Sequence, residues 1–151
     1  MKIGIVGNGF VGKATGILSC KDIEIMVYDI KPELCSSGVS ALKDILKCDF
    51  IFLSLPTPMS NDGSCYLKIV EDMVSNIKDL KYEGFLVLRS TVPVGTSDEL
   101  GIYFMPEFLT EKNYLEDFKN NKEWIFGLAG LDTDHKFKDK ISRLFQFAFK
   151  N

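Results

Sequence analysis

Short apolar runs alternate along this chain with segments whose apolar residues recur at helical spacing. The runs favour β-branched and aromatic residues, as expected for strands buried on both faces. Six strands are predicted, at residues 2–6, 23–28, 49–55, 85–88, 102–105 and 124–128. Helical spacing predicts helices at residues 13–20, 67–80 and 133–148, with a short helix near 40–46. This alternation predicts an α/β fold, doubly wound, with a mostly parallel sheet of about six strands.

A glycine-rich turn joins the first predicted strand to the first predicted helix. It is a G-x-G-x-x-G motif, the pattern of dinucleotide-binding Rossmann domains, in which glycines permit the tight turn, the approach of a diphosphate and close helix packing. The N-terminus of the following helix offers free N–H groups to phosphates. We therefore expect one Rossmann-like domain over residues 1–151 whose cofactor contacts include Gly7, Asn8, Gly9, Phe10, Val11 and Gly12.

An acidic residue, Asp29, follows the second predicted strand, close to the spacing of about 20 residues that this motif requires. Its carboxylate can accept hydrogen bonds from both hydroxyls of an adenosine ribose, and it would repel the 2′-phosphate of NADP. The sequence thus predicts NAD as the cofactor. The alternative is a bare βαβ unit with a purely structural glycine turn.

Composition narrows the class of protein. The chain has 151 residues, a net charge of −3 and a pI near 5.2, which argue for one domain and against a nucleic-acid partner. No apolar run approaches the roughly 20 residues of a membrane span, and a strand at the start of the chain leaves no room for a signal peptide. The four cysteines lack metal-ligand spacing, and the single histidine, His135, lies in a polar stretch. We expect a cytoplasmic protein with reduced cysteines, an exposed His135 and no metal site.

Four segments are predicted at the carboxyl ends of strands, where ligands bind in such folds. They are residues 7–12, 55–59, 90–92 and 107–111. Together with Asp29 they include I-G-I-V-G-N-G-F-V-G, L-P-T-P, S-T-V-P-V-G-T and M-P-E-F-L-T-E. In this order, over roughly residues 1–128, the pieces resemble the N-terminal NAD-binding domain of the UDP-glucose/GDP-mannose dehydrogenase family.

The resemblance implies a reaction and a substrate class. The family oxidises the C6 alcohol of a nucleotide sugar to a carboxylate in two NAD-dependent hydride transfers, so the implied partner is a nucleotide sugar of the UDP-glucose or GDP-mannose class. It also implies that Thr91 and Glu107 orient a water near the reacting carbon, with Glu107 as the base. Two structural alternatives stay open, in which Thr91 satisfies a turn and Glu107 caps a following helix.

The remaining implied contacts fall into three groups. The adenosine and ribose side of the cofactor would be lined by Leu55, Pro56, Thr57 and Pro58. The nicotinamide half would be approached by Ser90 and Thr91. The substrate would be touched by Glu107, Phe108, Leu109 and Glu111, and Glu111 would contact the cofactor as well.

Departures from the family leave the activity open. Members carry a central dimerisation domain with a catalytic cysteine and lysine and a C-terminal nucleotide-sugar domain, which this sequence lacks. Without the thiolate, the second oxidation has no covalent intermediate. Three hypotheses follow: the NAD half of a dehydrogenase completed by another polypeptide, a non-catalytic module that binds NAD or a nucleotide sugar, or a different small NAD-dependent reductase. The sequence leaves a homo-oligomer open as well.

Overall fold

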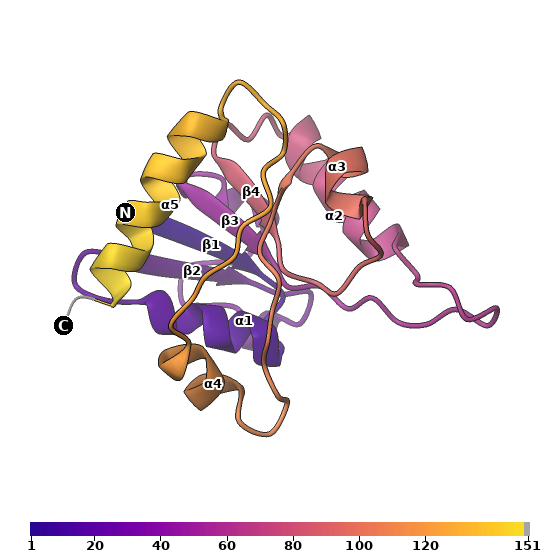
Figure 1. The fold of residues 1–151 in the computed structure, drawn as a ribbon, viewed down its shortest axis with the longest axis horizontal. Coiled ribbons are helices and arrows are strands. Elements are labelled where there is room, and N and C mark those ends of the chain that lie inside the picture. The colour runs from indigo at the N-terminus through magenta and orange to yellow at the C-terminus, as the bar shows by residue number, and fades with distance from the viewer. Residues whose placement is uncertain (150–151) are drawn as a thin grey trace.

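A computed structural model of the chain, which describes residues 1–149, contains a five-stranded, wholly parallel sheet with helices on both faces (Figure 1). The strands are β1 (Lys2–Val6), β2 (Glu24–Tyr28), β3 (Phe50–Leu53), β4 (Phe85–Leu88) and β5 (Tyr103–Phe104). The α-helices are α1 (Phe10–Thr15), α2 (Lys68–Asp79), α3 (Thr96–Leu100), α4 (Tyr114–Asn120) and α5 (Asp134–Ala148). The α/β, doubly wound fold predicted from the sequence is confirmed.

The strand order β2-β1-β3-β4-β5 creates a switch point beside β1. The chain runs from β1 to β2 on one side, then crosses to β3 on the other side of β1. The connections on the two sides of β1 leave in opposite directions, so a crevice opens beyond the carboxyl ends of β1 and β3, where ligands bind in such sheets.

Alternation along the central strand β3 builds the two halves of the core. Phe50 and Phe52 belong to the cluster that includes side chains of α1 and α5, and Ile51 and Leu53 belong to the cluster that includes α2. All four side chains are fully buried, because β3 has a strand on each side and helices over each face.

Helix α5 buries the residues expected from its 3.6-residue periodicity. These are Phe137, Ile141, Leu144 and Phe145, and on the other face α2 buries Val70, Val74 and Ile77 in the same way. Within residues 1–149, no helix has the length and apolar character that a membrane crossing requires.

The sixth predicted strand, at residues 124–128, does not join the sheet. Gly127 alone makes an antiparallel bridge to Phe104, with N–H···O distances of 2.8 and 3.1 Å. Trp124 and Phe126 instead pack against Phe145 of α5, in a tilted and an edge-to-face arrangement, with ring centroids 4.7 and 5.4 Å from that of Phe145. Figure 1 shows this segment crossing in front of the sheet. Aromatic packing on a helix therefore replaces the ladder of hydrogen bonds that the apolar run predicted.

The chain between β2 and β3 is more irregular than its sequence predicted. It contains only two 3₁₀ turns, Pro32–Leu34 and Leu42–Ile45. The Asp44 carboxylate accepts hydrogen bonds from the N–H groups of Ser40 and Ala41, each at 2.9 Å. The side chain of Asp44 thus caps the backbone at Ser40 and Ala41.

Candidate functional site

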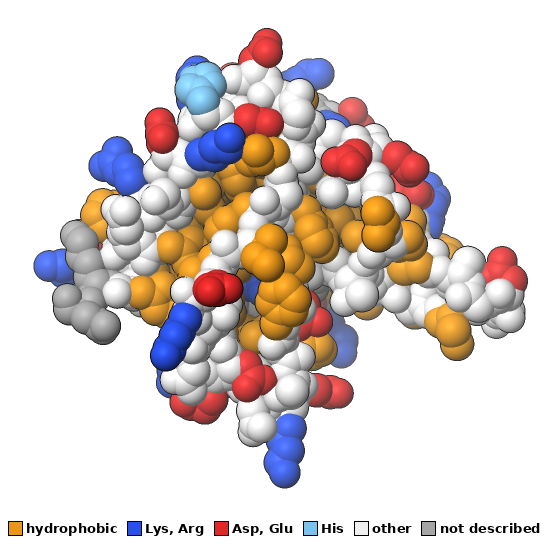
Figure 2. Space-filling model, viewed as in Figure 1, with side chains coloured by type: hydrophobic (Ala, Val, Ile, Leu, Met, Phe, Trp, Pro, Cys, Tyr) orange, Lys and Arg blue, Asp and Glu red, His pale blue; other side chains and the backbone are white. Residues whose placement is uncertain are grey.

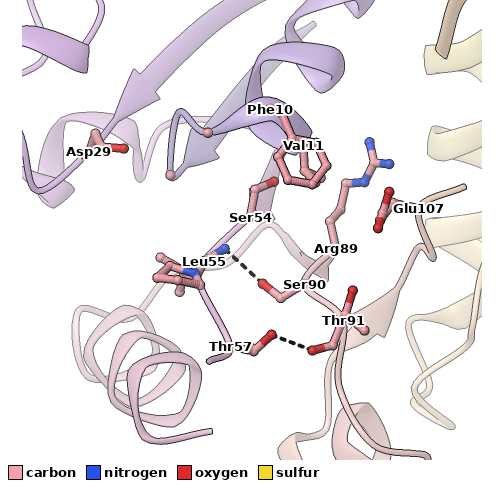
Figure 3. A pocket seen from close by; sticks show the side chains of 13 residues that line it. Phe10, Val11, Asp29, Ser54, Leu55, Thr57, Arg89, Ser90, Thr91 and Glu107 are labelled. Atoms are coloured by element: carbon pink, nitrogen blue, oxygen red, sulfur yellow. Dashed lines mark hydrogen bonds between the residues drawn. The ribbon is translucent and has the colours of Figure 1, made fainter. Parts of the chain in front are cut away.

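A pocket of about 330 Å³ opens at the switch point, beyond the carboxyl ends of β1, β3 and β4 (Figure 3). Eleven of its lining residues were predicted from the sequence: Gly7, Gly9, Phe10, Val11, Asp29, Leu55, Pro56, Thr57, Ser90, Thr91 and Glu107. Two were not, Ser54 and Arg89. The fold thus brings Asp29 and segments from four other parts of the chain together at the edge where the sequence placed them.

The three motif glycines have different surroundings. A Cβ on Gly7, whose φ is +91°, would lie 2.3 Å from the Ser54 carbonyl oxygen, and a Cβ on Gly12 would lie 2.0 Å from the Gly7 carbonyl oxygen. Both positions therefore exclude any side chain. A Cβ on Gly9 would meet nothing within 4 Å. Gly9 thus leaves an open approach to the backbone on the pocket wall, as a bound diphosphate would require.

The carboxylate of Asp29 lines the same pocket and ties the glycine turn to β2. One oxygen accepts a hydrogen bond from the Asn8 N–H at 2.7 Å, and the other accepts from the Lys31 N–H at 2.9 Å. A carboxylate can accept about four hydrogen bonds, so positions remain for two ribose hydroxyls. The Asn8 side chain is itself occupied, since its amide donates to the Leu34 carbonyl at 2.7 Å.

Two hydroxyl groups fasten the loops after β3 and β4 to each other. The Ser90 hydroxyl accepts from the Leu55 N–H at 2.9 Å, and the Thr57 hydroxyl donates to the Thr91 carbonyl at 2.7 Å. Ser90 is 5% exposed, so its hydroxyl holds the loops in place. Thr91 is exposed at the pocket, where its side chain is available to a ligand.

Glu107 approaches the pocket from the segment after β5. One carboxylate oxygen accepts the Leu109 N–H at 2.9 Å, which fixes a turn two residues long. The first helix after Pro106 is α4, which begins only at Tyr114, so Glu107 does not cap a helix. The second carboxylate oxygen is left for other partners.

Several residues implied by the resemblance lie outside the pocket lining. They are Asn8, Gly12, Pro58, Phe108, Leu109 and Glu111. Phe108 and Leu109 line a smaller adjoining cavity of about 50 Å³, and Phe108 is 66% exposed. Glu111 is exposed in the turn before α4. Their implied contacts with substrate and cofactor stay predictions.

Arg89 is one of the two lining residues that were not predicted from the sequence. It follows β4 directly and is 1% exposed, and its Nη1 donates to the Thr15 hydroxyl at 2.8 Å. Burial lowers the pKa of Arg89 to about 10, and the negative charge of Glu107 opposes that shift. A cationic residue at the end of a buried strand, just before the Ser-Thr pair, was the signal that could have found it.

The other missed lining residue, Ser54, has a buried hydroxyl with no hydrogen-bond partner among the described residues. A buried polar group without a partner costs free energy that a ligand can recover. Together with the open side of Gly9 and the unused positions on Asp29, this hydroxyl makes the pocket fit a dinucleotide.

Comparison with known proteins gives the same answer. Residues 36–148 match the family model described as "UDP-glucose/GDP-mannose dehydrogenase family, NAD binding domain". The chain belongs to this family. Its cofactor is NAD. The matched range begins after the glycine turn, so the turn adds an independent structural observation.

Individual relatives match between 78% and 97% of this chain. UDP-glucose 6-dehydrogenase YwqF of Bacillus subtilis is 26% identical over 97% of this chain and 42% of its own length. The UDP-glucose 6-dehydrogenase of Campylobacter jejuni is 28% identical over 78% of this chain and 39% of its own. The structure of GDP-mannose dehydrogenase from Pseudomonas aeruginosa superposes with a TM-score of 0.80, at 23% identity, over 97% of this chain and 44% of that one. The chain thus spans less than half the length of these dehydrogenases.

Proposed function

We propose that this chain supplies the NAD half of a nucleotide-sugar 6-dehydrogenase and acts on a substrate of the UDP-glucose or GDP-mannose class. The observation that carries the proposal is the single pocket in which the glycine turn and Asp29 meet Thr91 and Glu107. The first pair suits a dinucleotide, and the second pair offers a hydroxyl and a carboxylate beside it. Relatives named for UDP-glucose and GDP-mannose support the substrate class.

In this proposal the residues of the pocket divide the work. The backbone at Gly9 receives the diphosphate, and Asp29 holds the adenosine ribose. Leu55, Pro56 and Thr57 form the wall along the cofactor. When bound, NAD⁺ supplies the hydride acceptor. Thr91 orients a water or the substrate hydroxyl, and the free oxygen of Glu107 takes the proton from it.

The substrate half of the site and the covalent step come from polypeptide outside this sequence. None of the four cysteines lines the pocket, and all four are free thiols.

Figure 2 shows apolar side chains gathered over the segment between α4 and α5, where Ile125 is 56% exposed and Leu128 is 38% exposed. This surface supports contact with a completing polypeptide or a second copy. The free thiols support a cytoplasmic location.

A second candidate is a non-catalytic module that binds NAD or a nucleotide sugar. It is favoured by the absence of a cysteine from the pocket lining, because the family's second oxidation depends on a thiolate. The same pocket would then serve recognition alone.

One experiment separates the two. NADH formation is followed at 340 nm with UDP-glucose or GDP-mannose, first with this chain alone and then with the chain plus the remaining domains of a relative. We expect no sustained turnover alone, and turnover in the mixture that Glu107→Gln abolishes. Turnover by the chain alone would overturn the division of the site. A completed mixture that binds both ligands yet makes no NADH would favour the non-catalytic module.

A further inference from the structure

Arg89 carries a positive charge that forms no ion pair within the described part of the chain. It is 1% exposed, and no carboxylate of residues 1–149 lies within the 4.0 Å of an ion pair. Its pKa, even though burial lowers it to about 10, keeps the guanidinium protonated at neutral pH. A buried charge without an ionic partner is costly, so its retention at a pocket wall calls for a reason.

The contacts that Arg89 does make hold it in place but leave most of its hydrogen-bond donors unused. Nη1 donates to the hydroxyl of Thr15, which in turn donates to the Val11 carbonyl at 2.9 Å. The guanidinium carbon lies 5.4 Å from the ring centroid of Phe118 in α4. These contacts join β4, α1 and α4, and they use one of the five N–H donors of the side chain.

Arg89 also has an unused donor at the wall of the pocket. Nε is buried and has no hydrogen-bond partner among the described residues. Arg89 lines both the main pocket and the adjoining cavity beneath Phe108 and Leu109. Figure 3 shows its guanidinium beside Glu107, at the end of the pocket opposite Asp29. Glu107 already uses one oxygen on the Leu109 N–H.

We propose that Arg89 forms an oxyanion-binding subsite at this end of the pocket, which receives a phosphate or carboxylate oxygen of a bound ligand. A guanidinium binds such groups through charge-assisted, often paired hydrogen bonds. The anion has two sources, the diphosphate of the cofactor or the acid group of a second ligand bound beside it. Only the first source rests on the proposed function.

The chain offers a clean readout, because its sequence has only two arginines, Arg89 and Arg143. Arg143 is exposed on α5 and serves as the internal control. Their Nε–H signals are recorded in a ¹⁵N NMR spectrum and assigned with Arg143→Lys. Sodium phosphate and sodium acetate are then titrated, with sodium chloride keeping the ionic strength constant. We expect a saturable shift of the Arg89 signal and only a small, unsaturating shift of the Arg143 signal.

NAD⁺ distinguishes the two sources. If the diphosphate occupies the subsite, NAD⁺ moves the Arg89 signal, blocks phosphate binding, and binds at least about 10-fold more weakly to Arg89→Met, with partial recovery in Arg89→Lys. If a second ligand occupies it, phosphate or acetate still shifts the Arg89 signal in protein saturated with NAD⁺. Either result supports the subsite.

The proposal is overturned if neither NAD⁺ nor an oxyanion moves the Arg89 signal in the wild-type chain. Failure of the chain to bind NAD⁺ would count against its cofactor assignment, and the oxyanion titration would still test Arg89. Glu107→Gln keeps the proposal testable should Arg89→Met not fold. We expect this variant to bind phosphate more tightly, by about 3-fold or more, because it removes a neighbouring negative charge. Weaker binding would contradict the subsite.

Discussion

The polar groups at the two ends of the parallel strands are paired differently. We call the side of the sheet where the strands begin the amino edge and the side where they end the carboxyl edge. At the amino edge, polar groups satisfy one another: the Asp49 carboxylate accepts from the Lys2 N–H at 2.9 Å and from the Lys140 ammonium at 2.7 Å, and the Tyr82 hydroxyl donates to the Cys48 carbonyl at 3.0 Å. At the carboxyl edge, the Ser54 hydroxyl and the Arg89 Nε have no partner among residues 1–149.

This difference indicates the side of the sheet at which a ligand binds. Of the three buried side-chain atoms without a partner in the described residues, two line the switch-point pocket, and the third is an oxygen of Asp134 on α5. The open side of Gly9 belongs to the same edge. Protein groups complete most of the amino edge, whereas the carboxyl edge leaves donors and acceptors for a bound dinucleotide.

The largest effect is expected from filling the closed side of the glycine turn. Gly12→Ala puts a Cβ 2.0 Å from the Gly7 carbonyl oxygen, so we expect the free energy of unfolding to fall by about 3 kcal/mol. Gly9→Ala is the matched control, because its Cβ meets nothing within 4 Å. It should cost about 1 kcal/mol or less, yet weaken NAD⁺ binding by about 10-fold. Urea unfolding and NAD⁺ titration measure the two effects, and equal destabilisation by both variants would contradict the assignment of the turn.

The next effect concerns the acid at the tip of β2. Asp29→Ala should weaken NAD⁺ binding by about 10- to 100-fold, because hydrogen bonds from the ribose to a charged acceptor are lost. Asp29→Asn keeps one acceptor oxygen and removes the charge, so we expect it to narrow the preference for NAD⁺ over NADP⁺. Thermal shift with both dinucleotides measures this. An unchanged shift for a folded Asp29→Ala would defeat the ribose assignment.

The residues of the carboxyl edge differ in how far the sequence alone predicts them. The spacing of Gly7, Gly9, Gly12 and Asp29 was enough to predict where these residues lie, because each belongs to the turn after β1 or to the end of β2. Arg89 could not be assigned in this way. The environment of its side chain depends on Thr15 and Phe118, which lie in helices far from Arg89 in the sequence.

The fold shows the same division between local and tertiary effects. The buried face of α5 followed from periodicity, because a helix repeats its own pattern. The segment around Trp124 reads as a strand in isolation, and its rings instead pack on Phe118 and Phe145, which lie in other elements. Short apolar runs do not by themselves distinguish these two outcomes.

Alkaline pH should lower the stability of the protein through groups at the amino edge. Burial raises the pKa of the Cys48 thiol from 9.0 to about 11, and burial raises the pKa of Tyr82 as well. The unfolded chain therefore loses these protons first, so the stability present below pH 9 declines as the pH rises through 11. We expect Cys48 to account for a loss of about 1–2 kcal/mol in the free energy of unfolding. Urea unfolding at pH 8 and 10.5 measures it, and Cys48→Ala should lose less over this interval. An equal loss in both proteins would contradict this role.

Acid should have the smallest effect at this edge. Burial raises the pKa of Asp49, but the hydrogen bonds from Lys140 and the Lys2 N–H outweigh it and leave the pKa below its ordinary value. The stability that Asp49 contributes is present above the pKa of the unfolded chain and is lost as the pH falls through the folded value. Lys140→Met should cost less than about 1 kcal/mol at pH 7, because the pair is partly exposed. Lys138→Met on the same helix is the control. An equal loss of stability in both variants would show that the ion pair between Lys140 and Asp49 does not stabilise the protein.

Binding of the unmodified chain to the two dinucleotides tests the central claim most directly. In an isothermal calorimetric titration at moderate salt we expect one NAD⁺ per chain and an affinity for NADP⁺ at least about 10-fold weaker, because its 2′-phosphate would lie beside the Asp29 carboxylate. The absence of NAD⁺ binding, or equal affinity for the two dinucleotides, would contradict the assignment of this sheet edge.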